Sequence, residues 1–156
     1  MSAMNEKYLS MASDLRAISE DVHYEVSILS NASALIWNAL DGLNWCGFYL
    51  AVDNKLILGP FQGKIACTEI EFGNGVCGTA YVRNDTVLVE DVHQFSGHIA
   101  CDSASNSEIV VPVHKNGEIF GVLDIDSPLL ARFDREDQEG LELVVKTLEK
   151  ILSETD

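Results

Sequence analysis

Basic residues are scarce in this sequence. Ten Lys and Arg side chains stand against 25 Asp and Glu side chains, which gives a formal net charge of −15. No cluster of Lys or Arg interrupts this excess, so most of the surface would repel a phosphate backbone or an anionic membrane. We therefore predict no nucleic-acid partner and no membrane partner.

Long apolar runs are also missing. The longest, such as residues 109–113, are far shorter than the roughly 20 residues that a membrane-spanning helix needs. The N-terminal segment mixes charges into an amphipathic pattern and lacks the continuous apolar stretch of a signal peptide. We expect a cytoplasmic protein.

Its 156 residues, 47% of them hydrophobic, suit a single domain over residues 1–156.

The four cysteines lack the short spacings of a zinc site. Cys46, Cys67, Cys77 and Cys101 follow one another at intervals of 21, 10 and 24 residues, whereas structural zinc sites use motifs such as Cys-x-x-Cys. Permanent disulfides are rare in a reducing compartment. We therefore expect no metal and no other cofactor, and we interpret the thiols as core or redox groups.

Hydrophobic periodicity predicts an α+β fold. Helices are predicted where apolar residues recur every three or four positions, at residues 8–22, at residues 28–40 and after Asp134, which is the expected N-cap. Strands are predicted from alternation at residues 45–52, 55–58, 65–72, 86–90 and 107–126, with a short helix after the glycine loop at Gly73. We expect a central antiparallel β-sheet flanked by two N-terminal helices and a C-terminal helix.

Two of the cysteines lie in contrasting surroundings. Cys101 lies in the polar segment of residues 91–106, and a connection that long inside a compact domain is more often functional than idle. In the strand over residues 45–52, alternation sends Cys46 to the face shared by Phe48 and Leu50. We interpret Cys46 as a small buried hydrophobe.

The hairpin over residues 107–126 carries three acids near its ends, and its register decides whether they meet. A two-residue turn at Asn116 and Gly117 would pair residue 109 with 124 and point Glu108 away from Asp124. A three-residue loop with Gly117 in a bulge would pair 108 with 124 and place all three acids on one face. We favour the second register because its opposite face is wholly apolar, with Ile109, Val111, Val113, Ile119, Leu123, Ile125 and Gly121.

Carboxyl groups gathered in this way cannot all ionise cheaply, since each charge disfavours the next and partial burial disfavours all of them. One proton is then retained near neutral pH, where it can be donated to a weakly basic oxygen. Two other interpretations stay open. The acids can be solvated strand ends, or they can bind Mg²⁺ or Ca²⁺, although the sequence has no EF-hand loop.

Several long motifs now form a pattern. LNWCGFYL, LILGPFQGKIACTEIEFGNGVCGTA, VEDVHQFSGHIACDSASNSEIVVPV and GVLDID follow in this order. The sequence closely resembles the free methionine-(R)-sulfoxide reductases, a family of stand-alone GAF domains, over essentially the whole chain and most densely over residues 44–126. The resemblance implies a GAF-like fold, reduction of free L-methionine (R)-sulfoxide, thioredoxin as the reductant and a homodimer.

The resemblance also implies roles for particular residues. The matching positions are Cys101 as the catalytic cysteine, Cys67 and Cys77 as recycling cysteines, Glu108, Asp124 and Asp126 as the acidic pocket, and Trp45 and Tyr49 as its aromatic wall. Cys101 would attack the sulfoxide sulfur while Glu108 or Asp126 protonates the oxygen, and Asp124 would hold the substrate ammonium. Cys67 would then close a disulfide that Cys77 relays outward. Cys46 departs from the family pattern, where an apolar residue such as valine is expected.

Two rival functions belong to other classes. A GAF-like domain can bind a small molecule such as a cyclic nucleotide as a sensor, and reactive thiols can signal without turnover. Only an enzyme would consume NADPH continuously when methionine sulfoxide, thioredoxin and thioredoxin reductase are supplied.

Overall fold

The computed structural model describes residues 3–97 and 104–155. Its helices are α1 (Ala3–Ile18), α2 (Glu25–Ala39), α3 (Gly75–Arg83) and α4 (Arg135–Ser153), with a short 3₁₀ helix η1 (Val92–Gln94). Its strands are β1 (Trp45–Val52), β2 (Lys55–Gly63), β3 (Glu69–Glu71), β4 (Val87–Val89), β5 (Ser107–Lys115) and β6 (Glu118–Ser127). None of the described helices is long and apolar enough to cross a membrane.

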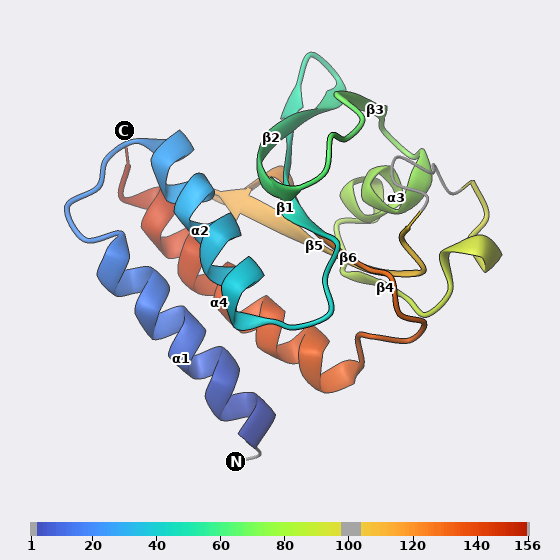
Figure 1. Ribbon diagram of the computed structural model, residues 1–156. Coiled ribbons are helices and arrows are strands. Elements are labelled where there is room, and N and C mark those ends of the chain that lie inside the picture. Colours follow the sequence, from blue (N-terminus) through green and yellow to red (C-terminus); the bar gives the residue numbers. More distant parts are fainter. Residues whose placement is uncertain (1–2, 98–103, 156) are drawn as a thin grey trace.

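The six strands form one antiparallel sheet in the order β3-β2-β1-β6-β5-β4. Helices α1, α2 and α4 lie together on one side of this sheet and α3 lies on the other (Figure 1). The α+β fold with a flanked antiparallel sheet is therefore confirmed. The sheet separates a helix-side core, beneath α2 and α4, from a pocket-side core beneath α3.

Strand β1 shows how alternation supplies both cores. Cys46 and Phe48 face the helix-side core, whereas Trp45 and Tyr49 face the pocket-side core. This matches the prediction for Cys46, which is fully buried. A Cβ atom at Gly47, on the same face as Trp45 and Tyr49, would overlap the Cβ of Phe61 on β2.

Several predicted boundaries are wrong. Helix α1 begins at Ala3 and ends at Ile18, because Asp21 takes a positive φ of 60° and the chain turns there. Strand β2 continues through Gly59 to Gly63, since a bulge keeps it paired with β1. Strand β3 is restricted to Glu69–Glu71.

The predicted register of the β5–β6 hairpin is also wrong. Lys115 pairs with Glu118 across a two-residue turn, in which Asn116 and Gly117 have φ values of 54° and 83°. Farther along, Val113 pairs with Gly121 and His114 with Ile119, so Phe120 is an extra, bulged residue in β6. Phe120 packs against the helix-side core, in the place predicted for Ile119.

Although the predicted register is wrong, the bulge places the three acids on one face of the sheet, as that register predicted. Glu108 lies opposite Asp126, and Asp124 lies opposite Val110 instead of opposite Glu108. The bulge moves the pairing by one residue relative to a simple two-residue hairpin, and side chains alternate with period two. Glu108, Asp124 and Asp126 therefore share one face of the sheet.

Helix α4 is fixed at its N-terminus as predicted. Asp134 accepts a hydrogen bond from the backbone N–H of Asp137 at 2.9 Å, and the Asp134 N–H donates to Asp137 Oδ2 at 3.0 Å. The other carboxylate oxygen of Asp137 accepts from the buried Tyr8 hydroxyl at 2.7 Å, which joins α1 to α4. Gly140, one turn along α4, lies against the Tyr8 ring so closely that a Cβ there would overlap it.

We expect Gly140→Ala to destabilise the protein. The new methyl group must displace Tyr8, and overpacking of this kind costs about 1–3 kcal/mol, which outweighs the gain in helix propensity of about 1 kcal/mol. Urea unfolding followed by circular dichroism measures the difference. Lys146→Ala, at an exposed position of the same helix, is the matched control. Equal unfolding midpoints for the two variants would contradict the Tyr8 contact.

Candidate functional site

A pocket opens on the sheet face beneath α3. It encloses about 530 Å³ of space between atoms, part of which is open to solvent. Of the residues predicted for the site, those that line it are Trp45, Tyr49, Cys77, Glu108, Asp124 and Asp126. Residues from β1, β5, β6 and α3 therefore meet at one cavity.

The three acids of the pocket are buried. Glu108, Asp124 and Asp126 are 7%, 5% and 9% exposed. Buried charges are rare unless they are paired or neutralised. The interpretation of these acids as solvated strand ends is therefore wrong, and their burial calls for a chemical explanation.

Burial raises the pKa of Glu108 well above its usual range, and the nearby Asp124 and Asp126 raise it further. Both causes penalise the charged form of the carboxyl group. Glu108 therefore holds a proton at pH values where an exposed glutamate has lost it. The expectation that the cluster retains a proton agrees with this environment.

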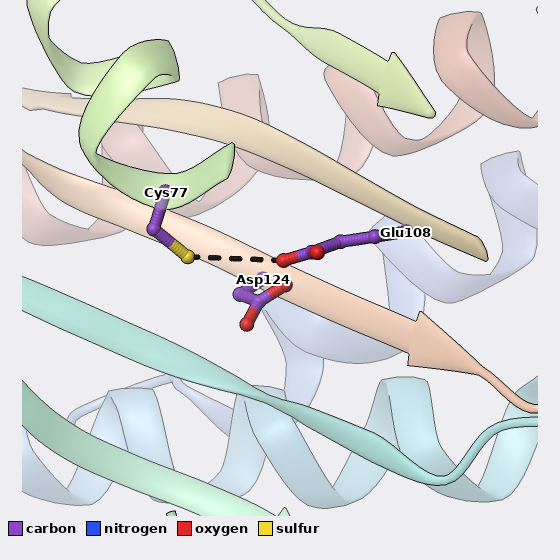
Figure 2. A group of neighbouring side chains, drawn as sticks. All are labelled: Cys77, Glu108 and Asp124. Carbon is purple, nitrogen blue, oxygen red and sulfur yellow. Dashed lines mark hydrogen bonds between the residues drawn. The ribbon is translucent and has the colours of Figure 1, made fainter. Parts of the chain in front are cut away.

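The Cys77 thiol lies against the same carboxyl group. Its Sγ atom donates a weak hydrogen bond to Glu108 Oε2 at 4.0 Å. Figure 2 shows Cys77 reaching down from α3 toward Glu108, with Asp124 beside them. Burial, and then Asp124 and Glu108, raises the pKa of the Cys77 thiol, so it stays protonated while the acids surround it.

An aromatic wall lies beside the acids, because Trp45 on β1 pairs with Asp126 on β6. The Trp45 ring stacks on Tyr49 at 5.7 Å between centroids and on Phe61 at 5.0 Å. Phe61 was missed because the sequence predicted a strand end at residue 58. The small residue opposite it, Gly47, is the only local signal that could have suggested it.

Two further polar residues near the pocket were also missed. Ser105 lines the pocket at 6% exposure, and its Oγ accepts a hydrogen bond from Asn44 Nδ2 at 3.0 Å. The Asn44 N–H donates to Asp126 O at 2.9 Å. The contact between Asn44 and Ser105 joins residues 61 positions apart in the sequence, and Asp126 lies farther still, so no local pattern marks these contacts.

Comparisons with known proteins point to one family of GAF domains. The sequence profile described as "GAF domain" matches residues 14–152. The chain is 52% identical over 151 residues to the free methionine-R-sulfoxide reductase of Escherichia coli (strain K12), covering 97% of this chain and 92% of that protein. The chain belongs to the free methionine-R-sulfoxide reductase family of GAF domains.

Solved structures of this reductase family have the same fold. The reduced form of fRMsr of Staphylococcus aureus superposes with a TM-score of 0.90 at 54% identity, over 93% of this chain and 94% of that one. The free methionine-R-sulfoxide reductase from Neisseria meningitidis, in complex with its substrate, gives a TM-score of 0.91 at 42% identity, over 97% and 92% of the two chains. The family resemblance drawn from the sequence motifs is confirmed.

The cysteines of this reductase-family domain differ in their states. Cys67 is half-buried and disulfide-bonded, whereas Cys46 and Cys77 are free. Burial raises the pKa of the Cys46 thiol on the helix side of the sheet, which agrees with an inert core residue. Cys101, the predicted catalytic cysteine, lies outside the described residues.

Three side chains of this reductase-family site are candidate metal ligands. Ligand atoms of Cys77, Glu108 and Asp124 all lie within 4.8 Å of one another, which is close enough to hold an ion. Mg²⁺ and Ca²⁺ prefer six or more oxygen ligands, and a protonated thiol supplies none. The group suits proton chemistry better than a hard cation.

Proposed function

We propose that this GAF domain reduces free methionine (R)-sulfoxide in the pocket beneath α3, with Cys101 as the nucleophile. Its place in the free methionine-R-sulfoxide reductase family supports the activity. The observation that carries the proposal is a buried carboxyl group with a raised pKa, Glu108, in a cavity with an aromatic wall. A proton held there is available to the oxygen of a bound sulfoxide.

The first chemical step moves oxygen from the substrate to the protein. The Cys101 thiolate attacks the sulfoxide sulfur, the Glu108 proton goes to the sulfoxide oxygen, and hydroxide leaves as the substrate S–O bond breaks. Hydroxide then attacks the Cys101 sulfur, breaks the transient S–S bond and displaces methionine as the reduced thioether, which leaves Cys101 as a sulfenic acid. Asp126, directly opposite Glu108, is the second candidate for the proton donor.

The second step forms a disulfide. The Cys67 thiol gives up its proton and attacks the sulfenic sulfur, the new S–S bond replaces the S–O bond, and the oxygen takes up a proton and leaves as water. The bonded state of Cys67 supports its capacity for this step. Cys77 is proposed as a second recycling thiol, although its raised pKa requires that it lose a proton first.

A dithiol protein of the thioredoxin type completes the cycle by supplying two electrons and two protons. This reductant implies a reducing compartment such as the cytoplasm.

We also propose a homodimer, on the basis of the family resemblance. Analytical ultracentrifugation tests that part, and a mass that stays at 17.1 kDa at all concentrations would contradict it.

Substrate recognition follows from the charges of the pocket. The aromatic wall of Trp45 and Tyr49 can pack on the apolar end of the substrate. Asp124, at 5% exposure, is proposed to accept a charge-assisted hydrogen bond from the ammonium group. A residue inside a peptide chain has no such ammonium group, so this contact would favour the free amino acid.

We expect Asp124→Asn to raise the KM for free methionine sulfoxide by about tenfold or more, because a hydrogen bond between charged groups contributes about 1.5–3 kcal/mol. Initial rates over a range of substrate concentrations measure the change. Asp53→Asn, at an exposed turn position between β1 and β2, removes the same charge without touching the pocket. An unchanged KM in the Asp124 variant would remove the ammonium assignment.

A further inference from the structure

Two side chains of the aromatic wall also hold the segment that carries Cys67. This segment, residues 64–68, connects β2 to β3 and has no regular secondary structure. Trp45 Nε1 donates a hydrogen bond to Lys64 O at 3.1 Å, and the Tyr49 hydroxyl donates to Cys67 O at 2.9 Å. The segment is therefore fastened to β1 at its start and at the cysteine itself.

We propose that the Tyr49 hydroxyl positions Cys67 for its attack on the sulfenic acid of Cys101, so that Tyr49 acts in recycling as well as in substrate binding. This inference rests on the proposed function, in which Cys67 is the resolving thiol. Tyr49 is a positioning residue here, because its hydroxyl donates to the backbone oxygen of Cys67 and would act on the thiol through that residue.

The side chain that supports the Cys67 backbone is buried. Tyr49 lies on the central strand β1 at 2% exposure, and its ring is held by stacking on Trp45. Burial, and then the charge of Asp124, raises the pKa of the Tyr49 hydroxyl. The hydroxyl therefore stays protonated and remains a donor over the pH range in which the enzyme would be assayed.

The expected benefit is a higher rate of disulfide closure. Fixing one backbone residue costs about 1–2 kcal/mol of conformational entropy, and a connection without secondary structure has several residues to fix. A thiol that is already held near its target avoids this cost at the moment of reaction. The hydrogen bond to Cys67 O would supply that order before the sulfenic acid forms.

The consequence is that substrate binding and thiol recycling share one wall. Trp45 and Tyr49 line the pocket, and their polar atoms donate to the segment of residues 64–68. Mutations in this wall should therefore affect both substrate binding and thiol recycling. The two effects can be separated by removing only the hydroxyl oxygen of Tyr49.

Tyr49→Phe removes the hydroxyl and keeps the ring. Reduced protein is mixed with excess methionine sulfoxide, and methionine release and the disappearance of dimedone-reactive sulfenic acid are timed separately. We expect the fold-decrease in the rate of disulfide closure to be about ten times the fold-decrease in the rate of methionine release. This difference corresponds to the loss of one positioning hydrogen bond. Tyr81→Phe, on α3 and stacked on Phe72, is the matched control and should change neither rate.

A second background separates positioning from general damage. In Cys67→Ser, where the sulfenic acid has lost its partner, the added Tyr49→Phe change should not lengthen the lifetime of the sulfenic acid further. Equal slowing of both steps by Tyr49→Phe, or slowing of neither, would overturn the inference and leave the proposed function standing. If the unaltered protein releases no methionine, the proposed function itself fails.

Discussion

Cys101→Ser is expected to abolish the reduction of methionine sulfoxide, with a loss of at least about 10⁴-fold, as for other enzymes that lose their nucleophile. A serine hydroxyl is a much weaker nucleophile than a thiolate. Its oxygen also cannot take up the sulfoxide oxygen, whereas a cysteine sulfur does so by becoming a sulfenic acid. Consumption of NADPH in the presence of thioredoxin, thioredoxin reductase and free methionine sulfoxide measures the loss.

The control for this experiment is Cys46→Val. Cys46 is fully buried on the helix side of the sheet, and valine is the kind of residue that the family pattern suggests there. This variant should retain its activity, which would show that loss of an arbitrary thiol is tolerated. Sustained NADPH consumption by Cys101→Ser would contradict the assignment of the nucleophile. A parent protein that consumes none would favour a sensor.

Those parts of the fold that depend on local alternation were predicted well. Strand β1 was predicted with its exact limits, and the faces of Cys46 and Phe48 followed from a period of two. Asp134 was predicted as the N-cap of α4 because a side-chain acceptor precedes an amphipathic pattern. In these cases the residues that decide the structure are neighbours in the sequence.

The rest depended on contacts that local patterns do not encode. Gly59 and Pro60 are typical turn residues, yet pairing with β1 carries them into β2. Alternation decides which face Glu108 takes but leaves its partner open, because shifting the pairing by two residues preserves every face. The bulge at Phe120 therefore gave Glu108 a different partner while the predicted acid cluster remained.

We expect Glu108→Gln to lower kcat by about 10²- to 10⁴-fold, the usual contribution of a general acid. Glutamine has nearly the same shape and imitates the protonated carboxyl group, but it has no acidic proton to give to the sulfoxide oxygen. The kcat of the parent protein should also fall as the pH rises through the raised pKa of Glu108. A pH profile of kcat for both proteins measures this. An undiminished kcat in Glu108→Gln would indicate that Asp126 is the proton donor.

The same substitution should make the protein more stable at alkaline pH. The pKa of Glu108 is raised in the folded state, so its contribution to stability is fully present below the unfolded pKa and is lost as the pH rises through the folded pKa. Glutamine does not titrate, and the stability gained by Glu108→Gln should therefore grow with pH in urea unfolding experiments. Glu118→Gln, at the exposed start of β6, should show no such trend. A variant that is less active and yet more stable would indicate that the buried carboxyl group is retained for proton donation, at a cost to folding.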